Sequence, residues 1–209
     1  PLCLIVVILG NNQFNFFWLS YELWKPKWCT DRDYCLDGIL VDTLQDFLQQ
    51  QPLQDRVIVM HQIGSHGPSY YQRYPRDSAP FMPDCTTNAI QTCDKQVLVN
   101  SYDNSIAYTD QVLSGLIDQL AQDDRYQSSL VYVSDHGESL GENNLYMHGV
   151  PLSLAPKEQY EIPFIVWESD NSRPLKPNKE LTQYHVFHSV LNFLGIKSPI
   201  YDETMSIFQ

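Results

Sequence analysis

The chain is poor in charged residues, and above all in positive ones. Only 18% of its 209 residues are charged, and 13 Lys and Arg stand against 25 Asp and Glu, which gives a formal net charge of −12. Proteins that bind nucleic acid neutralise phosphates with clustered Lys and Arg. The composition therefore excludes a nucleic-acid partner, and an anionic substrate would need a local positive charge such as a bound dication.

No apolar run is long enough to cross a bilayer. The run at residues 2–9, LCLIVVIL, is much shorter than the about 20 apolar residues that a transmembrane helix needs. It also lacks the basic segment that opens a signal peptide. We therefore expect that the information for export belongs to an N-terminal part of the protein before residue 1.

Cysteine is scarce and odd in number, at five residues. Cys29 and Cys35, and likewise Cys85 and Cys93, lie close together in polar stretches that are typical of loops. This spacing favours two short-range disulfides and an oxidising compartment. Zinc ligation stays open as an alternative, although neither pair has the C-x-x-C spacing of a zinc knuckle. Cys3 lies in an apolar run and is predicted to be a buried thiol.

Strand-like apolar runs alternate with segments of helical spacing. Strands are predicted at residues 2–9, 56–60, 128–134 and 163–167, and helices at 37–51, 95–121 and 184–194, with an irregular loop region at 11–36. Continuous apolar strands between helices predict an α/β fold with a mostly parallel sheet that is covered on both faces. In such folds ligands bind beyond the carboxyl ends of the strands.

The segment at residues 134–149, SDHGESLGENNLYMHG, carries the clearest chemical signal. A predicted strand delivers Asp135 and His136 side by side, two glycines allow tight turns, and His148 follows twelve residues after His136. A carboxylate and imidazoles suit a dication such as zinc. The alternative is a turn-capping Asp135 beside a surface His136, which would leave so particular a pattern unexplained.

A second polar loop follows the predicted strand at 56–60. It reads HQIGSHGPSYYQRYP and contains two histidines, His61 and His66. His66 lies in a stiff Ser-His-Gly-Pro context beside a strand end, which makes it a candidate for the same site. For His61 an ordinary hydrogen-bonding role is the favoured interpretation.

These two loops closely match the lipid A phosphoethanolamine transferases, the family that includes the mobile colistin-resistance enzymes. CTDRDYCLDGILVD at residues 29–42 and CTTNAIQTCDKQVLVNSYDNSIAYTD at 85–110 also resemble segments of that family. The resemblance covers residues 28–209, so that residues 1–27 form an unmatched N-terminal segment.

The resemblance implies an alkaline-phosphatase-like three-layer α/β/α fold. Residues 28–209 would be the C-terminal part of a sulfatase-like catalytic domain, on the periplasmic face of the bacterial inner membrane, with transmembrane helices before residue 1. The implied activity is zinc-dependent transfer of phosphoethanolamine from phosphatidylethanolamine to lipid A through a covalent phosphothreonine. Both predicted disulfides match family disulfides.

The resemblance also implies a role for each candidate site residue. Asp135 and His136 are implied to be ligands of the catalytic zinc. His66 and His148 are implied to contact a second zinc or the substrate phosphate, and we expect one of them to act in catalysis as well. A histidine is suited to protonate a leaving alcohol, because imidazole titrates near the operating pH.

The sequence departs from the family pattern before residue 28. In the family, the first strand ends in a Gly-Glu pair whose Glu binds zinc, and a threonine nucleophile follows. Here LCLIVVILG leads to Asn11 and Asn12, and the nucleophile is unknown. We therefore expect a truncated chain that binds zinc weakly and does not by itself turn over phosphatidylethanolamine. The alternatives are an inactive metal-binding fragment and a related phosphatase or sulfatase-type hydrolase, although the sulfatase motif C/S-x-P-x-R is absent.

Overall fold

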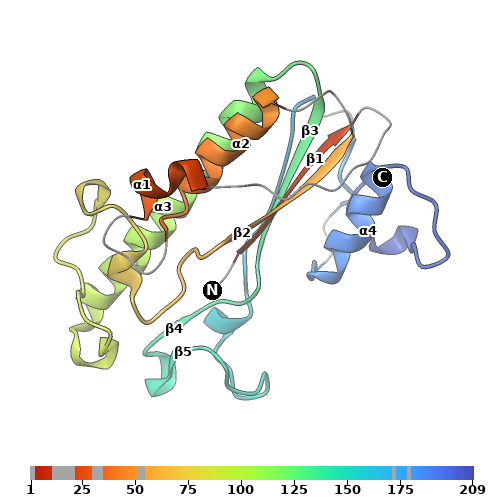
Figure 1. Ribbon diagram of the computed structural model, residues 1–209. Helices are drawn as coiled ribbons and strands as arrows, with labels where there is room; N and C mark the ends of the chain where they lie inside the picture. Colours follow the sequence, from red (N-terminus) through yellow and green to blue (C-terminus); the bar gives the residue numbers. More distant parts are fainter. Residues whose placement is uncertain (1–2, 11–21, 30–34, 51–54, 171–172, 178–179) are drawn as a thin grey trace.

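A sheet lies between two layers of helices in the computed structural model, which describes residues 3–10, 22–29, 35–50, 55–170, 173–177 and 180–209. The helices α1 (Lys25–Trp28), α2 (Ile39–Gln50) and α3 (Lys95–Gln122) cover one face, and α4 (Tyr184–Phe193) covers the other (Figure 1). The four main strands are β1 (Cys3–Gly10), β2 (Arg56–Gln62), β3 (Gln127–Ser134) and β6 (Phe164–Glu168). The predicted three-layer α/β/α arrangement is confirmed.

The strand directions differ from the prediction of a mostly parallel sheet. The strand order is β2-β1-β3-β6, and each of the three neighbouring pairs is antiparallel. The prediction was wrong on this point because a continuous apolar run shows that both faces of a strand are covered, which is typical of parallel strands but does not require them. β2 and β3 still run in the same direction, since β1 lies between them and is antiparallel to both.

The register brings the C-terminal ends of β2 and β3 to the same end of the sheet, which is called the sheet edge below. Cys3, at the start of β1, pairs with Gln62 on one side and with Ser134 on the other. These partners are the last residues of β2 and β3. The loop that contains His66 and the loop that begins at Asp135 therefore leave the sheet at neighbouring positions.

Side chains of β3 pack against both helical layers, because successive residues of a strand point to opposite faces. Leu130 and Tyr132 pack in the core cluster beneath α2 and α3, whereas Val131 packs with Phe193 of α4. The β2 strand alternates instead: Ile58 and Met60 are buried, and the residues between them are less so.

The predicted helices agree with the structure at most of their ends. α2 and α3 each lie within about two residues of the expected bounds, and α4 ends one residue before the expected end. The region 11–36 was predicted to be a loop, but it contains α1 and a 3-10 turn at Glu22–Trp24. Residues 11–21 and 30–34 of that region lie outside the described part of the chain.

The long helix α3 buries different residues along its length. Its second half buries mainly apolar residues, among them Val112 and Leu116, whereas its first half buries several polar ones, Ser101, Asn104 and Ser105. Ile106 of the first half is apolar but exposed. The buried polar groups exist because this half of the helix packs against loops whose backbone needs hydrogen-bond partners.

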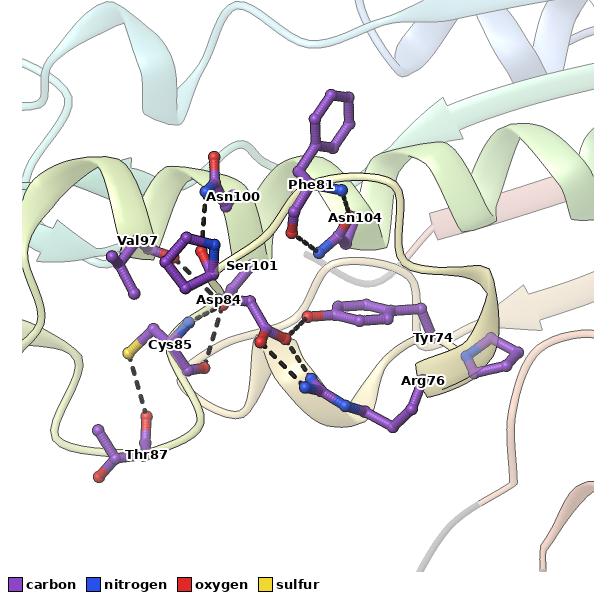
Figure 2. Close-up of polar contacts among 12 residues, drawn as sticks. Tyr74, Arg76, Phe81, Asp84, Cys85, Thr87, Val97, Asn100, Ser101 and Asn104 are labelled. Carbon is purple, nitrogen blue, oxygen red and sulfur yellow. Dashed lines mark hydrogen bonds and ion pairs between the residues drawn. The ribbon is translucent and has the colours of Figure 1, made fainter.

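Figure 2 shows how these polar groups hold the loop at residues 74–85. Asn104 accepts from the N–H of Phe81 and donates to its carbonyl oxygen, both at 2.9 Å. The Ser101 hydroxyl lies 2.5 Å from the N–H of Cys85. Tyr74 and Arg76 both point to Asp84, and the Tyr74 hydroxyl donates to it at 2.5 Å. The loop after the His66 segment is thus tied to α3.

The two predicted disulfides, Cys29–Cys35 and Cys85–Cys93, are formed. The second closes the segment at residues 85–93, directly before α3. The prediction for Cys3 concerns a side chain outside the described ones. Among the described residues, no helix combines the length and the apolar character that a bilayer span requires.

Candidate metal centre

The loop after β2 is held by a buried carboxylate. Asp37, just before α2, accepts the N–H groups of Ile63 at 2.9 Å and Gly64 at 2.8 Å. Gly64 has a φ of 55°, a left-handed conformation that glycine adopts without strain. Burial raises the pKa of Asp37 from 3.8 to about 6, although these two N–H groups favour the ionised form. Asp37 therefore fixes the loop that leads to His66.

Two further contacts hold His66 itself. Arg73 donates from Nε to the carbonyl oxygen of His66 at 2.8 Å. The neighbouring Ser65 hydroxyl lies 2.7 Å from that of Ser105 in α3, and both serines are buried. The position of the His66 ring thus follows from α3 and from the chain that succeeds the loop.

The loop after β3 passes very close to a second backbone segment. The N–H of Gly137 donates to the carbonyl oxygen of Gln159 at 2.9 Å. A Cβ atom at Gly137 would lie 1.9 Å from the carbonyl oxygen of Glu158, so only glycine fits there. Gln183, at the start of α4, donates to the carbonyl oxygen of Asp135 at 2.7 Å. The segment at 158–159 and the start of α4 therefore both help to fix this loop.

The structure brings the predicted residues together. The ring centroids of His136 and His148 are 3.8 Å apart, and those of His66 and His148 are 5.6 Å apart. Asp135 lies beside them, with its Oδ1 atom 3.6 Å from Nε2 of His136, and its side chain is 46% exposed. His61 lies apart in β2, where its side chain is exposed. That His66, Asp135, His136 and His148 bind a metal stays a prediction.

Each of the three clustered imidazoles has its Nδ1 atom against an oxygen acceptor. Nδ1 of His66 lies 2.7 Å from the carbonyl oxygen of Gly67, and Nδ1 of His136 lies 2.9 Å from that of Gly137. A carbonyl oxygen accepts only, so the ring nitrogen must carry the proton. In the neutral ring Nε2 then keeps its lone pair, which is the state that a metal ligand requires.

Glu138 does the same for His148, and the sequence analysis missed it. Its Oε1 atom lies 3.1 Å from Nδ1 of His148 and 3.5 Å from the N–H of Gly67. Its Oε2 atom accepts the Tyr70 hydroxyl at 3.0 Å. Burial, and then the charge of Glu138, raise the pKa of Tyr70 far above its ordinary value, so the phenol stays a donor.

A signal for Glu138 was present in the sequence. It stands two residues after His136 in a loop already assigned to metal chemistry, and it is the one carboxylate of the stretch at 134–141 besides Asp135. The glutamate is fully enclosed, whereas Asp135 is half exposed. A buried carboxylate beside histidines orients them or binds the ion itself.

The donor atoms fit a dication. His136, Glu138 and His148 each offer one ligand atom, and these atoms lie within 4.8 Å of one another. Imidazole nitrogen with carboxylate oxygen is a donor set that zinc accepts, and other first-row dications accept it too. The residues present are therefore suited to hold a metal ion, and the donor set alone does not choose the element.

The fold and this cluster agree with the family to which the chain belongs, the sulfatase family, whose pattern matches residues 9–196. The chain is 39% identical over 197 residues to phosphoethanolamine transferase EptA of Escherichia coli K12, which covers 88% of this chain and 36% of that protein. It is 36% identical over 173 residues to phosphatidylethanolamine transferase Mcr-1 of Escherichia coli, and this match covers 80% of this chain and 32% of that protein. The chain thus spans about a third of the length of these curated relatives.

Solved structures show the same likeness. The soluble domain of lipooligosaccharide phosphoethanolamine transferase A from Neisseria meningitidis matches with a TM-score of 0.81 at 36% identity, over 90% of this chain and 59% of that chain. The C-terminal periplasmic domain of phosphoethanolamine transferase EptC from Campylobacter jejuni matches with a TM-score of 0.75 at 38% identity, over 82% and 57%. The similarity to phosphoethanolamine transferases and the alkaline-phosphatase-like fold are confirmed.

Proposed function

We propose that this chain is the metal-binding part of a zinc-dependent enzyme that transfers phosphoethanolamine from phosphatidylethanolamine to lipid A. One observation carries the proposal: three imidazoles, each with Nδ1 held by an acceptor, present Nε2 at one sheet edge. The relatives of the chain are named as phosphoethanolamine transferases. Both substrates are phosphate-bearing lipids, which suits a cationic centre in an acidic protein.

Each residue has a proposed role in this centre. Asp135 and His136 would hold the zinc, and His148 would offer Nε2 to the same ion or to the substrate phosphate while Glu138 orients its ring. Bound zinc would supply positive charge to phosphoryl oxygens, which carry negative charge in phosphoryl transfer. His66 or His148, when its ring is protonated on both nitrogens, would give the Nε2 proton to the leaving alcohol. The nucleophile stays unassigned.

We place the protein on the periplasmic face of the bacterial inner membrane. Support comes from solved relatives, one of which is described as an integral membrane protein from Neisseria meningitidis and matches 90% of this chain with a TM-score of 0.82. The disulfides Cys29–Cys35 and Cys85–Cys93 are typical of a protein from an oxidising compartment.

A chimera tests the transfer. Residues 28–209 would replace the matching segment of the Escherichia coli EptA relative, and lipid A would be analysed by mass spectrometry. We expect lipid A to gain phosphoethanolamine, and the same chimera with His136→Ala to lose at least about 100-fold in transfer. Equal transfer by the two chimeras would contradict the proposal.

The chain of 209 residues alone is expected to bind zinc weakly and to transfer nothing, because no nucleophile is assigned. Zinc titration by calorimetry and an assay with phosphatidylethanolamine test this. Nanomolar affinity together with transfer by the chain alone would refute the expectation, and would remove the alternative of an inactive metal-binding fragment.

A hydrolase is the second candidate, because the matched family is described as sulfatase. It would release the phosphate or sulfate ester to water and pass nothing to a lipid. A chromogenic phosphate ester and a chromogenic sulfate ester separate the two readily. Turnover of either that is lost with His136→Ala, without phosphoethanolamine transfer by the chimera, would favour the hydrolase.

A further inference from the structure

An uncharged apolar segment surrounds and follows His148. Residues 145–156, LYMHGVPLSLAP, contain no Asp, Glu, Lys or Arg, in a chain with a formal net charge of −12. Leu152 is 71% exposed and Leu154 is 70% exposed, which places them among the most exposed large apolar side chains of the described residues. Exposed apolar groups that gather in one place mark an interaction surface.

A tight turn holds both leucines outward. The N–H groups of Leu154 and Ala155 both donate to the carbonyl oxygen of Pro151, at 2.8 and 3.0 Å. Pro156, which follows directly, is buried. The leucines are therefore exposed because they belong to a hydrogen-bonded turn that is anchored at its end by the buried Pro156.

The turn is attached to the metal centre at both ends. His148 stands three residues before Pro151. On the other side, Gln159 is buried and donates from Nε2 to the Ser139 hydroxyl at 2.8 Å, while its carbonyl oxygen accepts the N–H of Gly137. In Figure 1 the segment, which begins with β5 (Tyr146–Met147), lies beside β4 (Ser139–Leu140), at the end of the molecule to which β3 leads. Whatever the leucines contact is thus brought close to His148.

Amphipathic residues flank the leucines. Tyr146 and Tyr160 are exposed on either side of the turn, and the exposed Lys157 follows it. Tyrosine is enriched where an apolar phase meets water, because its ring is apolar and its hydroxyl is polar. Lysine reaches the headgroup region with its ammonium group while its stem stays apolar.

We propose that residues 145–160 form a lipid-contacting turn, in which Leu152 and Leu154 enter the lipid–water interface of a bilayer. Tyr146 and Tyr160 would lie at headgroup level, and the turn would hold His148 at the membrane surface. A bilayer fits better than a protein partner, because residues 145–156 carry no charged side chain, expose two leucines and are flanked by tyrosines, while the charges of Lys157, Glu158 and Glu161 all come after them. The proposal rests on the proposed function only in that both substrates there are lipids.

Vesicle flotation tests it directly. The chain is mixed with vesicles of phosphatidylcholine, which is zwitterionic and so does not repel an acidic protein. We expect the chain to float with the vesicles, and the variant Leu152→Ser/Leu154→Ser to lose about tenfold or more in partition, because serine removes most of the buried apolar area. The matched control is Leu23→Ser/Ile200→Ser, which changes two equally exposed side chains elsewhere and should partition like the unchanged chain.

Two outcomes would overturn the proposal: no flotation of the unchanged chain, or equal flotation of the Leu152→Ser/Leu154→Ser variant. Thermal unfolding of each variant shows that it is folded. Gel filtration without vesicles covers the case in which a second copy occupies the turn: a dimer that the serine variant abolishes, without flotation, would also overturn it. The vesicles contain neither phosphatidylethanolamine nor lipid A, so flotation succeeds or fails independently of transfer by the chimera.

Discussion

The histidines at the sheet edge and a histidine of α4 use Nδ1 in opposite ways. At the sheet edge, Nδ1 of His66, His136 and His148 faces a carbonyl or carboxylate oxygen. In α4, Nδ1 of His188 accepts the backbone N–H of Asp202 at 3.0 Å. The neutral ring therefore keeps its proton on Nδ1 in the first region and on Nε2 in the second.

The difference lies in the backbone around each ring. The loops after β2 and β3 turn so that a carbonyl oxygen, or the buried Glu138, comes next to Nδ1. The lone pair of Nε2 is then available to bind a metal. The segment after α4 presents an N–H group to His188, so that its Nε2 carries a proton. One residue type thus serves as a candidate ligand in one region and as a hydrogen-bond acceptor for the chain in the other.

The largest expected effect is on metal affinity when a sheet-edge ring is removed. His136→Ala and His148→Ala should each weaken zinc binding by more than about 100-fold, because each removes a free Nε2 atom, and loss of an outer partner alone costs about 10–100-fold. His188→Ala and His61→Ala are the matched controls and should bind zinc as the unchanged chain does. Calorimetric titration measures the zinc affinity of all four variants. A comparable loss of affinity in the His188→Ala variant would contradict the distinction between the two kinds of histidine.

Next comes the acceptor that holds His148. Glu138→Ala should weaken zinc binding by about 10–100-fold, because Nδ1 of His148 loses its partner and the ring its orientation. Glu138→Gln keeps an oxygen acceptor and should recover part of the affinity if the glutamate orients the ring. If the two variants bind zinc equally weakly, the glutamate acts as a ligand through its charge, and its placement as an orienting group is wrong.

The third test concerns Asp37, whose folded-state pKa of about 6 lies above the ordinary value of 3.8. Between these values the folded chain binds more protons than the unfolded chain, so the contribution of Asp37 to stability is full below the lower pKa and is lost as pH rises through the upper one. The free energy of unfolding of the unchanged chain, minus that of Asp37→Asn, should fall by up to about 3 kcal/mol from about pH 4 to about pH 7.

Urea unfolding at a series of pH values measures this difference. Asp110→Asn, at an exposed position of α3, is the control. The free energy of unfolding of the unchanged chain, minus that of this variant, should not show the same fall between about pH 4 and about pH 7. A difference for Asp37→Asn that is constant over the whole range would show that the carboxyl group has no raised pKa in the folded chain, and that its support of the His66 loop is of another kind.

The smallest effect is expected from the hydroxyl of Tyr70. Tyr70→Phe leaves a buried oxygen of Glu138 without this donor and should lower the free energy of unfolding by about 1 kcal/mol. Tyr71→Phe is the neighbouring control. Its hydroxyl accepts a hydrogen bond from the adjacent Gln72 at 3.3 Å, and its loss should change stability by less than about 0.5 kcal/mol. A reversed order of the two would contradict the described network.

The helices were predictable because their signals are local. Ile39, Leu44 and Leu48 recur at helical spacing, and all three are buried in α2. The first half of α3 was not predictable in the same way, because Ser101 and Asn104 resemble a solvent-facing side in the sequence. Their burial follows from the loop at 74–85, which needs donors and acceptors from the helix.

Strand direction and the partners of Glu138 also lay beyond the sequence. The apolar run of β3 predicted burial correctly, but direction depends on the pairing partner, and β1 inserts between β2 and β3 in the opposite direction. The candidate histidines followed from their position after strands. The position of Glu138 in the same loop was a signal too, but its contacts were not predictable, because Tyr70 and His148 reach it only in the folded chain.

The most direct test of this account is the tautomer of each histidine, measured by long-range hydrogen–nitrogen correlation NMR on the metal-free chain at a pH where the rings are neutral. Single His→Ala variants assign the signals. The account predicts a proton on Nδ1 and an unprotonated Nε2 for His66, His136 and His148, and the reverse for His188. A proton on Nε2 in the three sheet-edge rings would contradict the claim that the fold prepares them to hold a metal.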